Sequence, residues 1–584
     1  MRYPAMTEVK RSTSGVTNFW GYDHRLKPQE NAFHDMKNMS SEWLPVMSTR
    51  RKRGYLRTMD KPNGLFAHDK LCWVDGTGFF YAGEKKGTVE DSPKQMIRMG
   101  AYVLIWPDAK YYNTHTGEFG ELGASFTTYT DMEVTCSLCT QDGGQFEKYT
   151  KGKTAPANPE NGEQWLDTSV TPNVLRYYST TAGMWQSVQT VFTKIQSPDI
   201  GKAFAQHDGI EISGMELETL NGSFYVVNRG DDYLVVVALI SESHTQSATV
   251  TVERKVPKMD YVCELDNRIW GCSSEKHEIY CCALGDPKNW NQYMGLAGDS
   301  YAVTVGSSGD FTGAKGHQGN MLFFKENSVH TVMGTKPANF QVETSECRGV
   351  MKGCHKSIVA VNGTLLYKNH FDVCRFGASM PAVVSDVLGG VNYHNAVGGA
   401  VNGRYYICMQ DEEGRPHLFV YDTSNGAWTK EDHSDVLDFA TLDGSIYMLL
   451  TNGELWCLNG LGAAEYKDAE AHEEGANDTE KAPEWMLETG DIGIDEPNNR
   501  YVSGIQIHGE CELGATVRME IRCDTSRTWE HVMTCTPVTR RSLTIPYVPR
   551  RCRTMRIRLS GTGEFKLYSI TKNTEAGSDV YGTA

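Results

Sequence analysis

The sequence reads Val361-Asn362-Gly363-Thr364-Leu365-Leu366-Tyr367 at one of five places between Tyr261 and Leu458 where a single strand-turn-strand phrase recurs. Each variant has a polar turn of Asn or Asp, usually with Gly, followed by β-branched and aromatic residues. The other variants are Asp266-Asn267-Arg268-Ile269-Trp270, Gly319-Asn320-Met321-Leu322-Phe323-Phe324, Val401-Asn402-Gly403-Arg404-Tyr405-Tyr406 and Leu442-Asp443-Gly444-Ser445-Ile446-Tyr447. Such turns supply the positive φ that tight hairpins require, and the residues after them suit a pleated strand.

The spacing of these phrases is typical of propeller blades. Asn267 and Asn320 are 53 residues apart, and steps of 42, 40 and 41 residues then lead to Asn362, Asn402 and Asp443. A period of roughly 40–50 residues with several short strands per unit is the signature of a β-propeller. A single four-stranded sheet cannot cover both its faces, so several must pack face to face around an axis. Ordinary meander turns in a β-sandwich remain the alternative.

A second cue supports blades. The run Phe419-Val420-Tyr421-Asp422, followed after a turn by Trp428, resembles the outer-strand signature of kelch-type blades, in which the aromatic residue caps the sheet beneath. Asp286-Pro287-Lys288-Asn289-Trp290 is similar to a shortened version of the same signature. We therefore expect about six blades.

The strand phrases begin at Gly64 and are interrupted by about 145 residues of different pattern. Insertion at a loop whose ends are close changes stability little. The sequence therefore predicts an all-β chain: a β-propeller interrupted by an inserted β-rich domain and followed by a C-terminal β-sandwich. The expected boundaries are an N-terminal arm at 1–58, first blades at 59–112, the inserted domain at 113–255, remaining blades at 256–460, an acidic linker at 461–484 and the sandwich at 485–584.

The inserted domain carries a Pro/Asn/Gly linker at 155–163 that leads into a compact aromatic module. Its aromatic residues either form a small buried core or bind sugar or a partner subunit. These residues are Trp165, Tyr177, Tyr178 and Trp185.

Composition excludes some classes of protein. The formal net charge of −16 over 584 residues argues against a surface that grips nucleic acid phosphates throughout. A local basic patch is compatible with that charge. We find no run of 18 apolar residues and no signal peptide, which predicts a protein made in a cytoplasm without a membrane anchor.

The sixteen cysteines lie mostly inside apolar strand runs, where free thiols behave as small hydrophobic groups. Cys136 and Cys139 form one isolated pair with no second pair and no His ligand nearby. The pattern predicts a reduced protein with no metal site at this pair.

Two basic segments are candidates for contact with phosphates or with an acidic partner. The first is the loop Arg50-Arg51-Lys52-Arg53. The second has no acidic residue and contains Arg540, Arg541, Arg550, Arg551, Arg553, Arg556 and Arg558. Arg556 and Arg558 alternate with apolar residues and so share one face of a strand. Ordinary solvated side chains remain the alternative for both segments.

No catalytic constellation stands out. The chain has no His-Glu-x-x-His, no phosphate loop, no Gly-x-Ser-x-Gly elbow and no dinucleotide fingerprint. Gly306-Ser307-Ser308-Gly309 has the wrong spacing for the elbow and is expected to be a turn. The histidines of the blade turns, namely His317, His330, His355 and His394, are expected at the surface. A glycosidase propeller needs two carboxylates at a defined separation, and no pair is singled out. We therefore expect no enzyme, no cofactor and no metal.

Dispersed phrases of the arm and propeller resemble tail nozzle proteins of short-tailed bacteriophages, also called tail tubular protein B or packaged-DNA stabilisation protein. They cover roughly half of the chain and contain no diagnostic catalytic motif. These phrases are Glu30–Met39 with Pro45 and the basic loop, Asn267–Cys272, Leu284–Trp290, Asp299–Tyr301, Val305-Gly306, Gly309–Gly313, Phe323–Glu326, Gly334–Phe340 and Asn395–Gly399.

The resemblance implies a structural protein of the virion tail, synthesised in the cytoplasm of a host bacterium. It implies a six-fold ring of identical copies below a tail adaptor protein, next to tail fibre or tip proteins. The ring would enclose a channel that retains the double-stranded genome and conducts it during ejection, without sequence recognition. The alternative is a carbohydrate-binding or polysaccharide-degrading propeller at a phage tail tip.

Overall fold

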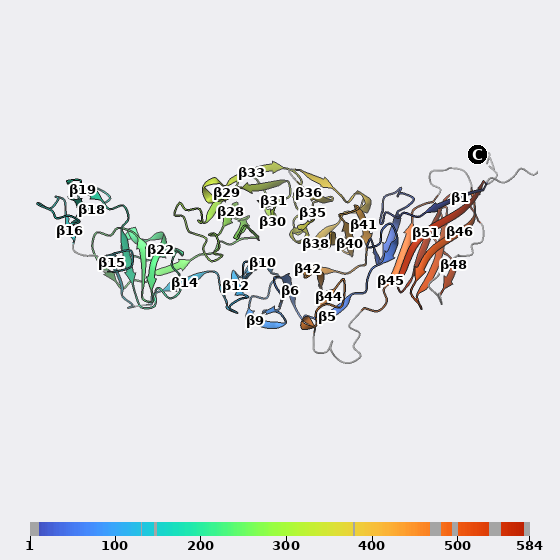
Figure 1. The fold of residues 1–584 in the computed structure, drawn as a ribbon, viewed down its shortest axis with the longest axis horizontal. Coiled ribbons are helices and arrows are strands. Elements are labelled where there is room, and N and C mark those ends of the chain that lie inside the picture. The colour runs from blue at the N-terminus through green and yellow to red at the C-terminus, as the bar shows by residue number, and fades with distance from the viewer. Residues whose placement is uncertain are drawn as a thin grey trace, which may run out of the picture.

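The computed structural model describes residues 11–129, 131–144, 149–377, 380–467, 480–492, 500–536 and 550–576. Three β-rich bodies lie in a row, with the inserted domain at one end, the propeller in the middle and the sandwich at the other end (Figure 1). The helices among these residues are single turns of 3-10 helix: η1 (Glu218–Leu220), η2 (Pro337–Asn339), η3 (His355–Ser357), η4 (Asp386–Leu388) and η5 (Ala464–Tyr466). The predicted all-β fold is confirmed.

The propeller consists of seven four-stranded antiparallel sheets, one more than the sequence led us to expect. Blades 1 to 3 are β6 (Pro62–Ala67), β7 (Leu71–Asp75), β8 (Gly78–Tyr81), β9 (Glu84–Thr88); β10 (Gln95–Met99), β11 (Tyr102–Trp106), β12 (Lys110–Asn113), β13 (Phe119–Glu121); and β26 (Tyr261–Leu265), β27 (Arg268–Ser273), β28 (Glu278–Cys281), β29 (Tyr301–Thr304). Blades 4 and 5 are β30 (Phe311–His317), β31 (Asn320–Lys325), β32 (Ser328–Met333), β33 (Gln341–Glu346); and β34 (Val359–Val361), β35 (Thr364–Lys368), β36 (Val373–Phe376), β37 (Pro381–Val383). Blades 6 and 7 are β38 (His394–Val401), β39 (Arg404–Gln410), β40 (Pro416–Asp422), β41 (Ala427–Lys430); and β42 (Val436–Leu442), β43 (Ser445–Leu450), β44 (Glu454–Cys457), β5 (Gly54–Thr58).

The five recurring phrases mark the same place in five consecutive blades. Each forms the hairpin between the innermost and the second strand of blades 3 to 7. The turn residues have positive φ, as at Asn362 (48°) and Gly363 (74°). The Asn-Gly signal therefore predicted the hairpins correctly, because few other residues adopt this conformation without strain.

The ring closes non-covalently. Innermost strands contact one another in the order β6, β10, β26 and β30. From β30 the ring continues through η3, which contacts β35 of blade 5 and β38 of blade 6, and β34 also contacts β38; from β38 it continues through β42 back to β6. In blade 7 the outermost strand is β5, which comes from the N-terminal part of the chain and pairs antiparallel with β44. Residues 54–58 therefore belong to the propeller and not to the arm, which corrects the expected boundary at residue 58.

The aromatic residue of the kelch-like phrase lies at a blade interface. Trp428 in β41 is 1% exposed, and its indole N–H donates to the Val384 carbonyl at 2.7 Å. Val384 directly follows β37, so the indole joins blade 6 to blade 5. In the shortened phrase, Trp290 is also buried, and its N–H donates to the Pro287 carbonyl of its own loop.

The inserted domain lies between blades 2 and 3. Its main sheet has the strand order β14 (Ala124–Thr127), β25 (Thr251–Arg254), β21 (Gly209–Ser213), β22 (Gly222–Gly230), β23 (Tyr233–Val237), β20 (Phe192–Gln196), β15 (Val134–Cys139) and β24 (His244–Gln246). A distal four-stranded module follows the order β16 (Tyr149–Gly152), β17 (Gln164–Asp167), β18 (Val174–Ser179) and β19 (Met184–Ser187). Because β13 completes blade 2, the domain begins near Ala124, later than the expected residue 113.

Polar contacts fix the inserted domain to the propeller. The buried pair Arg254–Asp208 lies at its base, and Arg254 Nε also donates to the Leu122 carbonyl at 3.2 Å. Asn289, in the loop of blade 3, accepts from the Gly209 N–H at 3.0 Å and donates to the His207 carbonyl at 2.7 Å. Blades 2 and 3 therefore both hold the domain.

The sandwich is built from both ends of the chain. One sheet has the order β3 (Met39–Ser40), β4 (Met47–Thr49), β51 (Phe565–Ala576), β46 (Arg500–Cys511) and β49 (Arg550–Cys552), with β1 (Arg11–Val16) also pairing with β51. The other sheet has the order β2 (Phe33–Lys37), β45 (Glu484–Thr489), β50 (Met555–Thr562), β47 (Thr516–Cys523) and β48 (Glu530–Cys535). Trp485 and Phe565 stack between the sheets with ring centroids 4.4 Å apart. The predicted arm therefore contributes four strands, β1 to β4, to the sandwich.

The segment expected to be a solvated acidic linker is partly packed. Tyr466 in η5 is 1% exposed, and its phenolic oxygen accepts from the Leu71 N–H at 3.3 Å. Residues 468–479 lie outside the described residues. Glu480 binds the Arg50 side chain of the arm.

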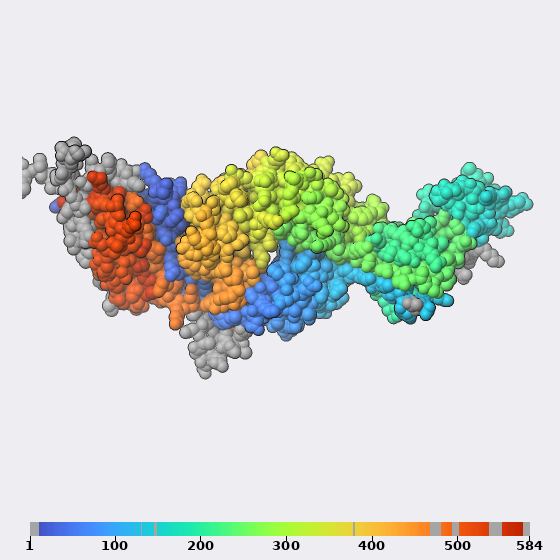
Figure 2. Space-filling view, turned by 180° about the vertical axis from the view of Figure 1, so that it is seen from behind, coloured from blue at the N-terminus to red at the C-terminus, as the bar shows by residue number. Residues whose placement is uncertain are grey.

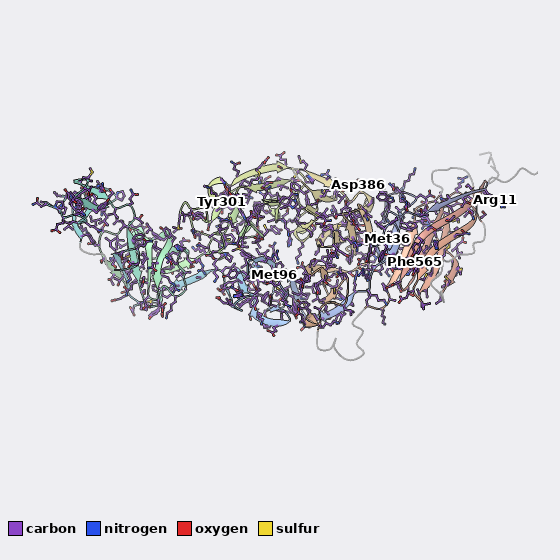
Figure 3. All side chains as sticks on the ribbon, viewed as in Figure 1. Arg11, Met36, Met96, Tyr301, Asp386 and Phe565 are labelled. Carbon is purple, nitrogen blue, oxygen red and sulfur yellow. The ribbon has the colours of Figure 1, made fainter. Side chains whose placement is uncertain are left out.

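One hydrophobic cluster joins the propeller to the sandwich. It extends from Phe324 in blade 4 through Tyr405 in blade 6 and the arm residue Met36 to Phe565 in the sandwich. Figure 3 shows Met36 between the propeller and the sheet that carries Phe565. The two bodies therefore share one packed core.

Candidate functional site

The propeller axis is occupied by a cavity of 530 Å³ to which each of the seven blades contributes its innermost strand. Figure 2 shows the ring hollowed at its centre, between blades 1 and 2 on one side and the later blades on the other. A volume of this size corresponds to about 18 water molecules at roughly 30 Å³ each. It is far too small to hold a DNA duplex, whose major groove alone is about 12 Å wide.

An ion pair ties three blades together at this cavity. Lys356 Nζ, in η3, lies 2.9 Å from Asp438 Oδ2 in blade 7 and 3.0 Å from the Leu437 carbonyl. The same carboxylate oxygen accepts from the Leu65 N–H of blade 1 at 3.3 Å. Asp438 is therefore engaged in structural contacts.

The cavity does not have the arrangement of a glycosidase active site. Its acidic lining residues are Glu264 and Asp438. Glu264 accepts the Asn267 N–H of its own hairpin turn at 3.0 Å, and Asp438 is held by Lys356. Glycosidases of the usual kind need one free carboxylic acid and one free carboxylate facing each other across the substrate.

Ser307 and His330 form an arrangement that resembles a nucleophile and its base. Ser307 Oγ lies 2.7 Å from Nε2 of His330, and Nδ1 of the same ring lies 2.9 Å from Thr344 Oγ1. His330 is fully buried, which corrects the expectation of a surface histidine; His317 is also buried. Burial, with the nearby Lys325 ammonium, lowers the pKa of His330 to about 4. Thr344, the third residue, carries no charge, and a histidine with so low a pKa is a weak base. The Ser307–His330 pair is therefore a poor catalyst.

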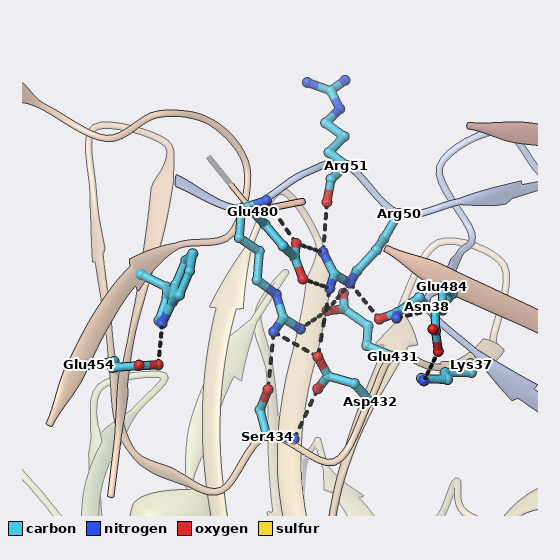
Figure 4. A network of polar contacts seen from close by, with 12 residues as sticks. Lys37, Asn38, Arg50, Arg51, Glu431, Asp432, Ser434, Glu454, Glu480 and Glu484 are labelled. Carbon is cyan, nitrogen blue, oxygen red and sulfur yellow. Dashed lines mark hydrogen bonds and ion pairs between the residues drawn. The ribbon is translucent and has the colours of Figure 1, made fainter. Parts of the chain in front are cut away.

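The first basic segment lies at the junction of arm, propeller and sandwich (Figure 4). Arg50 and Arg53 are 5% and 4% exposed. Arg53 Nη2 lies 2.6 Å from Glu431 Oε2, and its Nη1 lies 2.8 Å from Asp432 Oδ2. Both carboxylates follow β41 of blade 6. The arginine that precedes the closing strand β5 is thus fixed to the neighbouring blade.

Arg50 completes this junction network, which we define as Arg50, Arg53, Glu431, Asp432 and Glu480. Arg50 binds Glu480 through two N–H groups at 2.7 and 2.6 Å and donates to Asn38 at 2.8 Å. The network therefore connects the arm, blade 6 and the segment that enters the sandwich.

Charges within the junction network stabilise one another. Burial alone would raise the pKa of Asp432, but Arg53 and Arg50 outweigh it and lower that pKa to about 2. Burial likewise opposes ionisation of Glu480, while the hydrogen bonds from Arg50 lower its pKa. For Arg53, burial disfavours the charge, and Asp432 and Glu431 raise the pKa above its ordinary value. Asp432, Glu480 and Arg53 are therefore charged near neutral pH.

Arg51 and Lys52, the other two residues of this segment, are less buried than Arg50 and Arg53. Arg51 is exposed, and its Nε donates to Glu42 at 3.0 Å. Lys52 is half-buried and has no ion pair with any residue that the structure describes. The prediction of a phosphate-facing loop is therefore wrong for Arg50 and Arg53, because carboxylates of the same chain already occupy them.

The second basic segment is neutralised in a similar way. Arg556 Nε lies 2.7 Å from Asp491 Oδ1, and Arg558 Nη2 lies 2.7 Å from Oε2 of the buried Glu488. The Arg558 guanidinium also lies 3.9 Å from the centroid of the Trp529 ring. As predicted, the two arginines share one face of β50. That face meets acidic residues of the protein's own sheet.

Of the other five arginines of this segment, the structure describes the side chain of Arg553 alone. Arg553 is exposed. Arg550 and Arg551 belong to β49, but their side chains lie outside the described residues, as do Arg540 and Arg541 entirely. For these four, the predicted basic patch stays a prediction.

The carboxylates that bind the arginines were missed by sequence reasoning. Glu431 and Asp432 are 378 and 379 positions from Arg53, and an acidic pair after an outer strand looks like an ordinary solvated turn. Glu480 falls in a segment whose acidity predicted a linker. The basic run itself gave no signal, because the sequence does not show which acidic groups the fold brings to it.

The aromatic residues of the distal module form a packed cluster. Trp165 is 7% exposed, and its indole N–H donates to the Gly152 carbonyl at 2.9 Å. Trp185 meets Trp165 and Tyr178 edge to face, each at 5.5 Å. Tyr177 donates its hydroxyl to Gln186. These steep angles favour a small core over a flat platform for a sugar ring.

The Cys136 and Cys139 thiols face different hydrophobic clusters, because three residues along a strand separate opposite faces. Burial raises their pKa to about 12 and about 11, so both are protonated near neutral pH. Within the described ranges, no group of three or more His, Cys, Asp or Glu side chains is arranged to hold a metal ion. The same ranges contain no helix with the length and hydrophobicity of a membrane span.

No family model and no curated protein matches the sequence. Among solved structures, BamB from Moraxella catarrhalis is similar over 70% of this chain and 97% of its own, with 10% identity and a TM-score of 0.32. The computationally designed Ika8 protein matches 70% of this chain and 100% of its own, with 8% identity and a TM-score of 0.31. An exo-β-1,3-galactanase from Phanerochaete chrysosporium covers 53% and 95%, with 10% identity and a TM-score of 0.22. At these scores the propeller assignment rests on the strand order of the chain itself.

Proposed function

We propose that the protein is a structural component of a bacteriophage tail, a nozzle or hub protein that stands in a ring around the DNA channel. In this role it retains the packaged genome and conducts it during ejection, and it performs no catalysis. The proposal starts from the sequence phrases of the arm and propeller that resemble tail nozzle proteins.

The observation that carries the proposal is the mechanical continuity between the propeller and the sandwich. Both termini of the chain build the sandwich, the arm closes blade 7 on its way into the propeller, and one hydrophobic cluster runs through both bodies. A load applied to either body is therefore transmitted through packed side chains and the junction network. Such construction suits a protein that must hold a pressurised genome.

The size of the axial cavity decides where DNA would pass. A cavity of 530 Å³, lined in part by the Lys356–Asp438 pair, leaves no room for a duplex inside the propeller. The channel must therefore lie between copies of the chain, with each propeller forming a segment of the wall.

The charges of the protein are compatible with a channel wall that does not bind DNA. The chain has a net charge of −16, and five of its candidate phosphate-binding arginines are bound to its own carboxylates. Few phosphate contacts mean little counterion release, and repulsion within about a Debye length of 8–10 Å keeps the duplex away from the wall. DNA could then slide through without sequence recognition.

The proposed partners are other copies of this chain in a six-fold ring, a tail adaptor protein above the ring, and tail fibre or tip proteins. The proposed location is the tail of the virion. Synthesis would take place in the cytoplasm of the host bacterium.

The alternative is a carbohydrate-binding or polysaccharide-degrading propeller at a tail tip. Its best support is the position of the aromatic module at the far end of the inserted domain, where Met184 is 56% exposed beside Trp185. The edge-to-face packing of the aromatic rings argues against it.

Sedimentation of the purified full chain, combined with retention on immobilised bacterial polysaccharides, separates the two functions. A nozzle protein forms a closed assembly of several copies and passes through the polysaccharide without delay. A monomer or trimer that is retained by polysaccharide, or that releases reducing ends from it, would overturn the proposal.

A further inference from the structure

The axial cavity of the propeller is lined by more basic than acidic side chains, in contrast to the acidic chain as a whole. Its basic lining residues are Lys94, Arg98, Lys315 and Lys356, and its acidic ones are Glu264 and Asp438. Two of the cations already have partners. Lys94 Nζ lies 2.6 Å from Asp108, and Lys356 pairs with Asp438.

The other two cations have no carboxylate partner among the described residues. The side chain of Lys315, in the innermost strand of blade 4, is half-buried and makes no hydrogen bond or ion pair with any residue that the structure describes. The side chain of Arg98 of blade 2 makes none either, and Arg98 is exposed to solvent. Desolvation lowers the pKa of Lys315, because burial disfavours an ammonium without a counter-charge. The carboxylates that could neutralise it are engaged elsewhere.

The backbone adds hydrogen-bond donors to this positive surface. Each innermost strand is the edge of its sheet, so its outer N–H and C=O groups have no partner strand. Seven such edges converge on one cavity. Backbone N–H groups beside an unpaired cation are the chemistry that recognises a compact oxyanion.

We propose that the axial cavity is a binding site for a small oxyanion, a phosphate or carboxylate compound, whose charge is held by Lys315 Nζ with Arg98 as the second cation. The volume of 530 Å³ lies within the range of ordinary small-molecule sites. A bound anion links blades 2 and 4, which flank blade 3, across the axis and so stabilises the ring. This site does not depend on the proposed tail function, because it belongs to the single propeller.

The test is thermal unfolding of the full chain with inorganic phosphate or citrate as probe, at constant ionic strength adjusted with sodium chloride. The midpoint is expected to rise with probe concentration, by about 2 °C or more at roughly 10 mM, since a ligand that binds only the native state stabilises it. Lys315→Met should unfold at the same or a higher temperature without probe and show no rise with it. Lys85→Met, at an exposed position of β9, is the matched control and should respond like the native chain.

Two results would overturn the site. One is the absence of any rise with both probes in the native chain. The other is a rise of equal size in Lys315→Met, which would assign the effect to anions acting elsewhere. Circular dichroism of Lys315→Met is the check on folding: a native-like spectrum is expected, and with it a lost response is due to the missing ammonium.

Discussion

Arg53 Nη2 lies 2.6 Å from Glu431 Oε2, and this contact fixes the residue before the closing strand of blade 7 to the end of blade 6. The two residues are 378 positions apart in the sequence. Both are at least nine-tenths buried, so the contact is little screened by solvent. The first prediction concerns this pair.

Replacing Glu431 with Gln should destabilise the protein by about 3 kcal/mol, because it leaves a buried guanidinium short of a counter-charge. Denaturant unfolding followed by tryptophan fluorescence measures the change. Glu42→Gln is the matched control. Its partner Arg51 is largely exposed, so that variant should lose less than about 1 kcal/mol. Equal losses in the two variants would contradict the role assigned to the junction network.

The junction network should also make stability depend on acidity. The pKa of Asp432 is lowered to about 2 from its ordinary 3.8, and that of Glu480 is lowered too. Groups with a lowered pKa contribute stability that is complete above their ordinary pKa and is lost as the pH falls through the folded value. We expect unfolding free energy to fall between about pH 4 and pH 2. In Asp432→Asn, stability at pH 7 should be lower and the fall with acid shallower. Parallel pH profiles would show that other groups set the acid limit.

Removing the inserted domain should leave the propeller folded. Its first and last strands pair so that Ala124 lies opposite Arg254, which places the two ends side by side. Deletion of residues 124–254, with a short glycine linker in their place, should keep a cooperative thermal transition. Deletion of blade 5, residues 359–383, is the contrasting variant and should abolish folding, because the ring can no longer close. If the first deletion unfolds as completely as the second, the domain is part of the propeller core.

Ser307 should not react as a catalytic serine. His330, with a pKa of about 4 and only a threonine hydroxyl on its other nitrogen, activates the serine weakly near neutral pH. A fluorophosphonate probe should therefore leave Ser307 unlabelled in mass spectra of the digested protein, at the level of a Ser307→Ala control. Stoichiometric labelling of Ser307 would contradict this prediction and indicate that Ser307 is an activated nucleophile.

Much of the fold could be predicted because its signals are local. Asn362-Gly363, Asn402-Gly403 and Asp443-Gly444 dictate tight hairpins through backbone conformation alone, and their spacing gives the blade period. The closing strand Gly54–Thr58 was missed because its partner β44 lies about 400 residues away. Pairing at that distance leaves no periodic trace in a single sequence.

The junction network was missed for a related reason. Burial of Arg50 and Arg53 depends on Glu431, Asp432 and Glu480, which only the folded ring brings near. A basic run has the same appearance in sequence whether it faces phosphate, solvent or its own carboxylates. The sequence could not single out Lys315 either. Only the folded ring, in which seven strands line the cavity, shows that no carboxylate pairs with it.

Electron cryomicroscopy of the purified full chain is the sharpest test of the proposed tail function. We expect closed rings of several copies, in which the seven-bladed propellers stand side by side around an axial opening wide enough for a DNA duplex. Their own axial cavities should remain closed to it. Particles that stay single at high concentration, or assemblies without such an opening, would contradict it.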